Sequence, residues 1–262
     1  LDMQHSASYN IKFATALCMV CAVIVSLAYE MLHTRYELNA ALDKQRNVLI
    51  VSGLADENED LSREEVEARI SNIQTVIIDL QTGMPVTDID PGTFDQRKQA
   101  TNPLTSREAP DNRAQVQRLP EHVMVYEARG SDETLSMVVL PIEGMGLWST
   151  LYGFIALDAD LETIRGLTFY EHKETPGLGG EVDNPRWKAL WPGRRPFDEN
   201  LQPVISVIKG RAGSVNEDPY NVDGLSGATL TSRGVDHMLK FWLGAEVFGP
   251  YLQRIKQERE AS

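Results

Sequence analysis

The first apolar block of the chain covers residues 11–32, IKFATALCMVCAVIVSLAYEML. Between Phe13 and Tyr29 its only polar residues are Thr15 and Ser26. About 20 consecutive apolar residues allow a helix to cross a bilayer, so this pattern predicts a transmembrane helix over 11–32. The alternative is a cleaved signal peptide, which would have a basic start, a shorter apolar run and small residues at a cleavage site.

A polar helical pattern follows the apolar block. Leu38, Leu42 and Leu49 form a rough apolar stripe, which predicts a juxtamembrane helix over 33–54. The residues before the apolar block, 1–10, are expected to form an N-terminal tail.

The charges around the apolar block bear on its orientation. Lys12, near the N-terminal end of the block, is the only Lys or Arg before Phe13, whereas Arg35, Lys44 and Arg46 follow the block. Basic residues favour the cytoplasmic side of a membrane. Taken alone, this weak asymmetry favours a cytoplasmic C-terminal domain.

The remaining pattern predicts one α+β domain over 55–262, with a mainly antiparallel sheet and flanking helices. Short β-branched and aromatic runs separated by turn residues are typical of strands, and capped amphipathic runs are typical of helices. Ser62 and Glu65 have the spacing of a capping box. The predicted strands are 75–80, 122–128, 135–143, 151–158, 164–171 and 203–209, and the predicted helices are 63–70, 94–100, 185–191 and 232–243.

Composition narrows the classes of function. The 262-residue chain has a formal net charge of −13, which argues against a nucleic-acid partner because phosphate backbones require clustered Lys and Arg. Its two cysteines, Cys18 and Cys21, both lie in the apolar block, so no disulfide, thiolate nucleophile or Cys-bound metal is expected in the domain. Two interpretations stay open for this i, i+3 pair: lipid-facing or packing residues, or a redox or metal role shared with partner subunits.

Three glycine-rich segments follow predicted strands or precede a helix. They are GMGLWS (144–149), TPGLGG (175–180) and DGLSGATLTS (223–232). Glycine lets a backbone approach a flat ligand or a phosphate closely. Three such segments in one domain therefore indicate a ligand site.

The third segment adds hydroxyl groups just before the predicted helix over 232–243. The first turn of a helix offers free N–H groups and the positive end of its dipole, which suit a phosphate. An N-cap would account for Thr231 or Ser232 alone. The sequence GLSGA also approaches the nucleophile elbow of hydrolases, but that motif requires a strand immediately before it, and here a polar loop precedes it.

The quoted segments resemble a known family. SGAT (226–229) is similar to the flavinylation motif of FMN-bearing subunits of bacterial respiratory complexes. Further segments resemble the C subunit of the sodium-translocating NADH:quinone oxidoreductase, namely LDKQ (42–45), FDQRK (94–98), GLWS (146–149), YEHKETPGLGGEVDNP (170–185), FDEN (197–200) and VDGLSGATLTSRGV (222–235). The G subunit of the related Rnf complex shares SGAT and ETPGLG.

This resemblance implies a role for each matched residue. Thr229 would carry FMN through a phosphoester made by a flavin transferase that uses FAD as donor. The residues expected to hold the phosphate and ribityl chain are Ser226, Gly227, Ala228, Leu230 and Thr231. Those expected near the ribityl chain and the ring are Thr175, Gly177, Leu178 and Gly179 on one side and Gly146, Leu147, Trp148 and Ser149 on the other, with Glu174 and Lys209 as polar contacts. An alternative for Trp148 is a place in the core.

The resemblance also implies a cellular role. The chain would be a single-pass inner-membrane subunit with a periplasmic flavin domain, which is opposite to the orientation that the charges favour. It would transfer electrons, together with the other subunits, in a complex that oxidises NADH, reduces ubiquinone and exports sodium. The alternatives are an FMN-bearing subunit of an Rnf-type ferredoxin/NAD redox pump, and an anchored FMN-binding module without turnover.

Overall fold

The computed structural model describes residues 6–130 and 134–261, and its first element is the long helix α1, Ala7–Val51. The two helices expected over 11–32 and 33–54 are one continuous helix, because no Gly or Pro interrupts this stretch. The helix ends just before Gly53, whose φ of +72° is the left-handed conformation common after a helix C-terminus.

The N-terminal part of α1 is apolar on all sides. Ala7–His33 is long and apolar enough to cross a membrane, with a mean hydropathy of 2.3 in its most apolar window and none of that window buried. Cys18 and Cys21 are both exposed on this part of the helix, and their role stays a prediction.

The last turns of α1 belong to the globular domain. The chain divides into two compact units, Leu1–Lys44 and Gln45–Ser262, and the second unit includes the residues of α1 after Lys44. In the second unit Val48 and Leu49 are fully buried. The Thr168 hydroxyl donates a hydrogen bond of 3.0 Å to the Asn47 side-chain oxygen, which ties the end of α1 to the sheet.

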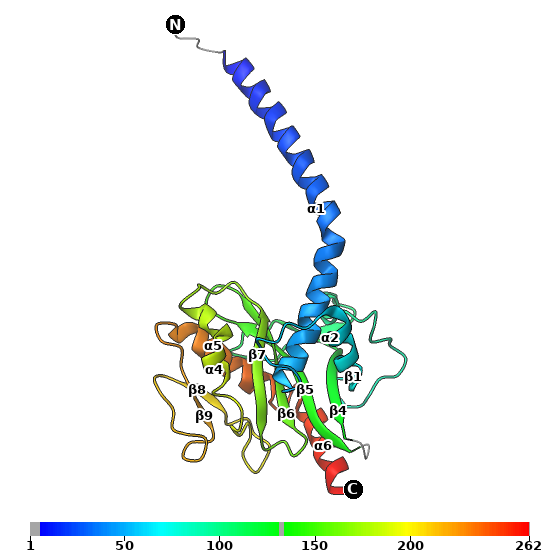
Figure 1. Ribbon diagram of the computed structural model, residues 1–262, viewed down its shortest axis with the longest axis vertical. Helices are drawn as coiled ribbons and strands as arrows, with labels where there is room; N and C mark the ends of the chain where they lie inside the picture. Colours follow the sequence, from blue (N-terminus) through cyan, green and yellow to red (C-terminus); the bar gives the residue numbers. More distant parts are fainter. Residues whose placement is uncertain (1–5, 131–133, 262) are drawn as a thin grey trace. The chain divides into compact units, whose positions relative to one another are not determined.

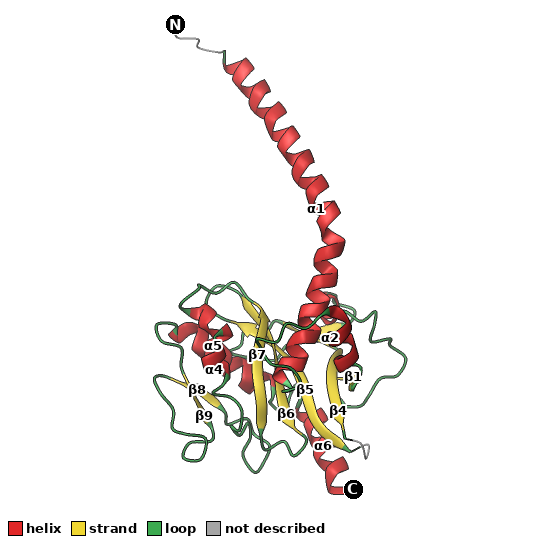
Figure 2. Ribbon diagram, in the orientation of Figure 1, coloured by secondary structure: helices red, strands yellow, loops and turns green. Residues whose placement is uncertain are grey.

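The domain is built on a five-stranded sheet with the order β1-β4-β5-β6-β7, in which every neighbouring pair is antiparallel. This confirms the predicted α+β class and the mainly antiparallel sheet (Figure 2). The strands agree with the predicted ranges apart from their ends: β1 (Ile73–Asp79), β4 (His122–Arg129), β5 (Leu135–Met145), β6 (Thr150–Asp158) and β7 (Ile164–Glu171).

Helices cover both faces of this sheet (Figure 1). One face packs against α5 (Thr229–Trp242) and α6 (Gly249–Ala261), and these elements form the main core with Leu140, Val235 and Tyr251 among its members. The other face meets the last turns of α1, and a Cβ on Gly166 would lie 2.8 Å from the Val51 carbonyl oxygen. Because both faces are covered, β5 is buried along most of its length and is apolar without alternation.

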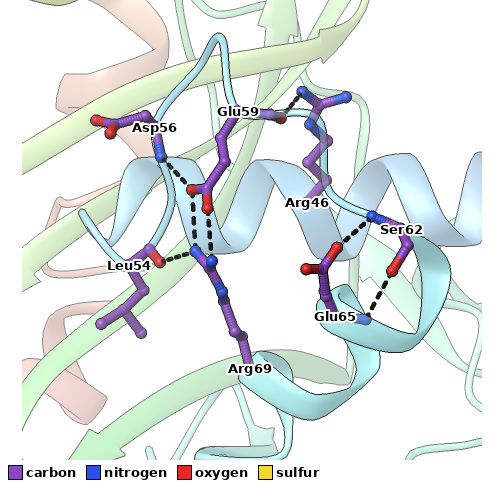
Figure 3. A network of polar contacts seen from close by, with 7 residues as sticks. All are labelled: Arg46, Leu54, Asp56, Glu59, Ser62, Glu65 and Arg69. Carbon is purple, nitrogen blue, oxygen red and sulfur yellow. Dashed lines mark hydrogen bonds and ion pairs between the residues drawn. The ribbon is translucent and has the colours of Figure 1, made fainter.

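Two arginines hold the chain where it leaves α1 (Figure 3). The Arg46 guanidinium donates a hydrogen bond of 2.6 Å to the Glu59 carbonyl oxygen. Arg69 binds both carboxylate oxygens of Glu59, at 3.0 and 2.5 Å, and also donates to the Leu54 carbonyl oxygen at 3.0 Å. Arg69 is part of α2 (Arg63–Ile70), so these bonds fold the loop after α1 back onto both helices.

The four predicted helices agree with the observed ones to within three residues at each end. The capping box of Ser62 and Glu65 is confirmed at α2, and Asp95 and Asn184 cap α3 (Gln96–Thr101) and α4 (Pro185–Lys188). Helix α4 is shorter than the predicted 185–191, since the chain turns so that Trp191 is fully buried. Helix α5 starts at Thr229 instead of Ser232.

Several short elements were not predicted from the sequence. The strand expected over 203–209 is only β8, which pairs in parallel with β9, and the excursion before β4 contains a small antiparallel pair, β2 and β3. The bounds are β2 (Ser106–Glu108), β3 (Arg118–Pro120), the 3₁₀ helix η1 (Gly179–Asp183), β8 (Ser206–Ile208) and β9 (Asn221–Asp223). Helix α6 was also missed, because its sequence is largely polar.

A truncated chain that begins at Tyr36 keeps the buried end of α1 and is expected to fold. In that chain Leu49→Ala should lower the free energy of unfolding by about 2–5 kcal/mol, because the Leu49 side chain is fully buried. The control Leu38→Ala should cost less than about 0.5 kcal/mol, since Leu38 is 49% exposed. Denaturant unfolding measures both, and equal costs would show that the end of α1 is not part of the core.

Candidate functional site

The three glycine-rich segments meet at one end of the sheet. Residues 144–149 connect the end of β5 to the start of β6. The second segment, extended here to residues 172–180, follows the end of β7. The third segment leads from β9 into α5. The antiparallel order of β5, β6 and β7 brings the first two segments side by side.

The Glu174 carboxylate joins all three segments. One of its oxygens accepts hydrogen bonds from the backbone N–H groups of Leu147, Trp148 and Ser149, at 3.0, 2.9 and 3.3 Å. The other accepts a hydrogen bond of 2.7 Å from the Thr231 hydroxyl on α5. Glu174 is almost fully buried, so this carboxylate is a structural link and its two oxygens already have protein donors.

Two of the predicted glycines leave room for this carboxylate. A Cβ on Gly146 would lie 2.6 Å from one Glu174 oxygen, and a Cβ on Gly179 would lie 2.5 Å from the other. A third glycine, Gly234 in α5, lets the helix contact the first segment, because its Cβ would lie 2.3 Å from the Met145 carbonyl oxygen. Close backbone approach, which only glycine permits, therefore assembles the site.

The electrostatics of Glu174 follow from these contacts. Burial alone would raise the pKa of its carboxyl, but the hydrogen bonds from Thr231 and from the backbone amides of Trp148, Leu147 and Ser149 outweigh burial and lower the pKa. The carboxylate form is the one that accepts four donors, so the folded site holds Glu174 ionised.

The hydroxyl groups of the third segment divide into buried and exposed sets. Thr231 is fully buried against Glu174, and Ser232 is buried where its hydroxyl accepts from the Leu225 N–H at 2.9 Å and donates to the Ala228 carbonyl oxygen at 3.1 Å. Ser226 and Thr229 are exposed. Within this segment, only the Ser226 and Thr229 hydroxyls are open to an incoming reagent.

Thr229 is the first residue of α5, and the start of this helix is unusual. The N-cap residue is Ala228, which has no side-chain acceptor, and among the described residues no side chain caps the helix. Ser, Thr, Asp and Asn are the residues that normally satisfy the first N–H groups. The first turn of α5 thus presents backbone donors beside an exposed hydroxyl.

Exposed apolar side chains surround this position. We define the apolar rim as Leu147, Trp148, Leu178 and Leu230, which are 40, 66, 45 and 53% exposed. All four lie in the segments that Glu174 joins, and a Leu178 methyl would lie 3.1 Å from a Cβ on Gly227. A soluble surface rarely gathers large apolar groups without a ligand or partner to cover them.

Comparison with known proteins identifies the family. The C subunit of the Na⁺-translocating NADH-quinone reductase of Yersinia pestis is 44% identical over 244 residues, which are 92% of this chain and 90% of the relative. The same subunit of Pseudomonas aeruginosa is 41% identical over 258 residues, covering 97% of this chain and 98% of the relative. The chain belongs to this C-subunit family.

The fold and a family model agree with this membership. The crystal structure of NqrC from Shewanella oneidensis superposes with a TM-score of 0.74 at 35% identity, covering 81% of this chain and 96% of that chain. The FMN-binding domain family matches residues 146–244. This range includes most of the first glycine-rich segment and all of the other two, so the assembled site lies within the FMN-binding domain.

Most of the predicted site residues lie in the three segments that Glu174 joins, but some of them are exposed and others are buried. Thr175, Gly177 and Leu178 are exposed on the second segment, and Trp148 is exposed on the first. Ser149 is partly buried, and its hydroxyl accepts a hydrogen bond of 2.7 Å from the Lys173 N–H. Lys209 is exposed after β8, and within the described chain no side-chain bond links it to the other site residues.

Three residues that shape the site were missed. Gly234 could have been noticed as a glycine inside an amphipathic helix, where it is unfavourable without a packing reason. His172 and Asp183 are joined at 2.7 Å, and no spacing rule predicts such a pair across a loop. No group of three or more His, Cys, Asp or Glu side chains suitable for a metal ion exists among residues 6–130 and 134–261.

Glu174→Gln should lower the free energy of unfolding at neutral pH by about 1–3 kcal/mol, because a neutral amide oxygen accepts the three backbone N–H groups more weakly than the carboxylate does. The pKa of Glu174 is lowered in the folded protein from an ordinary 4.5. The carboxylate therefore stabilises the fold above about pH 4.5, and this contribution disappears as the pH falls through the lowered value.

Denaturant unfolding at neutral pH and at about pH 4 measures this difference. The wild type should lose more stability on acidification than Glu174→Gln. The control Glu162→Gln should behave like the wild type, since Glu162 is largely exposed and lies 3.9 Å from its partner Arg195. An identical acid response in the wild type and in Glu174→Gln would contradict the assignment.

Proposed function

We propose that Thr229 carries FMN through a phosphoester and that the loaded chain transfers electrons within the Na⁺-translocating NADH-quinone reductase. The observation that carries the proposal is an exposed hydroxyl at the first position of an uncapped helix, bordered by an apolar rim, within the FMN-binding domain. Backbone N–H groups at a helix start suit a phosphate, and apolar side chains suit a flavin ring.

Burial favours Thr229 over the neighbouring hydroxyls. Thr231 and Ser232 are buried and already hydrogen-bonded within the protein. Ser226 is exposed, but it precedes the first turn of α5 and therefore lies outside the row of free helix donors. Thr229 combines exposure with those donors.

Attachment requires activation by a partner enzyme. A threonine hydroxyl is a weak nucleophile at neutral pH. A flavin transferase would remove its proton, a bond would form between the Thr229 oxygen and the FMN phosphorus of FAD, and the bond to the AMP phosphate would break. AMP leaves with the electron pair of that bond, so no external oxidant or reductant is needed.

The remaining predicted residues have roles that fit their positions. The backbone of Ser226, Gly227 and Ala228 would border the phosphate and ribityl chain, and the apolar rim would contact the ring. When bound, FMN supplies reversible redox chemistry that no side chain has. This chain's residues bind the cofactor, orient it and exclude water from the covered side.

The cellular setting extends the same proposal. The apolar stretch Ala7–His33 of α1 would anchor the chain in the bacterial inner membrane as a single span. The flavin domain would lie in the periplasm and contact the other subunits, which link NADH oxidation and ubiquinone reduction to sodium export. A redox titration of the whole complex separates this carrier role from a binding module without turnover, because a carrier is reduced and reoxidised during turnover.

Thr229→Ala should abolish covalent flavin, because the attacking hydroxyl is gone. Intact mass and in-gel flavin fluorescence of the denatured chain, after expression with the transferase, measure the attachment. Thr231→Ala is the matched control: it removes the neighbouring hydroxyl and should retain flavin while losing about 1 kcal/mol of stability. Flavin that survives Thr229→Ala would refute the assignment.

Gly177→Ala should change the flavin more than the fold. Gly177 has a φ of +76° with open space around a Cβ, so alanine adds backbone strain on the order of 1–2 kcal/mol and adds a methyl group to the segment proposed to lie beside the flavin. The flavin absorption maxima and reduction potential should shift, while covalent attachment persists. Spectroscopy, a reductive titration and thermal melting measure these effects.

Gly53→Ala is the control for this substitution. Gly53 has nearly the same geometry, with a φ of +72° and open space around a Cβ, but it follows α1 outside the site. It should lower the melting temperature by a similar amount without changing the flavin spectrum. An unchanged spectrum in Gly177→Ala would show that this segment lies away from the ring.

A further inference from the structure

His172 connects two segments beside the site. It is the first residue after β7, and its side chain is only 12% exposed. Its Nε2 lies 2.7 Å from a carboxylate oxygen of Asp183 in η1. Its Nδ1 accepts a hydrogen bond of 3.2 Å from the backbone N–H of Glu174.

These two partners favour different protonation states of the ring. A neutral imidazole with its hydrogen on Nε2 satisfies both, because Nε2–H donates to Asp183 while Nδ1 accepts from Glu174. The protonated ring keeps and strengthens the bond to Asp183. Its new Nδ1–H, however, faces the Glu174 N–H, so two donors oppose each other and the second bond is lost.

Three charged groups around His172 act on the pKa of its ring. The Asp183 carboxylate is the main cause that raises the pKa of His172 above its ordinary 6.5, burial opposes it, Glu174 adds to the rise and Lys188 on α4 lowers it. Lys188 is itself paired with Glu57 at 2.6 Å. The pKa of the His172 ring is therefore raised above 6.5, and histidine is the side chain whose charge ordinarily changes within the physiological range.

The backbone that His172 holds is the one that assembles the site. Glu174, whose N–H is the lost donor, binds the first segment and α5 through its carboxylate. Lys173, which lies between His172 and Glu174 in the chain, donates its N–H to the Ser149 hydroxyl at 2.7 Å. A change in the backbone at 172–174 thus reaches the first segment by two routes.

We propose that His172 is a positioning residue that makes the placement of the 147–149 turn, and with it the apolar rim, respond to proton uptake. With the neutral ring the Glu174 backbone is held and the turn is fixed against α5. With the protonated ring this hold weakens and Trp148 changes its surroundings. The link to flavin rests on the proposed function, but the movement of the turn does not.

Trp148 provides a measurement that needs no flavin. It is 66% exposed, whereas Trp187, Trp191 and Trp242 are 6, 0 and 0% exposed. The full chain is purified in detergent after expression without the transferase, and its emission is titrated with pH. The signal of Trp148 is the difference between the chain and its Trp148→Phe variant, and it should show a one-proton transition.

Two variants test whether His172 is the titrating group. His172→Asn keeps an acceptor oxygen for the Glu174 N–H but does not titrate, so the transition should be lost. Asp183→Asn removes the carboxylate that favours the protonated ring, so the midpoint should move to lower pH. The control His122→Asn, at the start of β4 opposite Asp79, should keep the wild-type midpoint.

The proposal is overturned if the wild type shows no transition, if the transition persists in His172→Asn, or if the midpoint in Asp183→Asn does not move. If His172→Asn fails to fold, the shift in Asp183→Asn still decides. In the flavinylated chain the flavin fluorescence should change with the same midpoint. If the Trp148 transition is present but the flavin fluorescence does not change with the same midpoint, the proposed position of the flavin is wrong. The role of His172 would still stand in that case.

Discussion

The carboxylate of Glu174 accepts hydrogen bonds from three consecutive backbone amides and from the Thr231 hydroxyl. A buried carboxylate is costly unless donors replace its water, and here the protein provides all of those named donors. Each donor comes from a segment that has no regular structure of its own or from the first turn of a helix. Without this group the three segments would have no common partner, so the site depends on it.

As a consequence, the residues of the three segments divide into a buried set and an exposed set. Glu174, Thr231 and Ser232 face inward and are satisfied by protein, whereas Ser226, Thr229 and the apolar rim face outward. The inward groups fix the geometry, and the outward groups are left for a ligand. At the start of α5, Thr231 and Ser232 are buried whereas Thr229 and Leu230 are exposed, because successive residues of a helix point in different directions.

The support beneath the site is a sheet covered on both faces. Helices α5 and α6 cover one face, and the buried end of α1 covers the other, where Asn47 meets Thr168 on β7. Strand β7 runs directly into the segment that contains His172 and Glu174. The end of β7 therefore places both residues, and the arginine bonds tie the loop after α1 to α1 and to α2.

The sequence was sufficient to predict those elements that are determined by neighbouring residues. The capping box at Ser62, the helical patterns over 11–32 and 33–54, and the long strands all follow from neighbouring residues. The resemblance implied Glu174 as a polar contact of the flavin, a role that stays a prediction. Only the tertiary structure decided that Glu174 links three distant segments and that Val48 and Leu49 are core residues. The physical reason is that burial and hydrogen-bond partners depend on which strands pair, and pairing joins residues far apart in the chain.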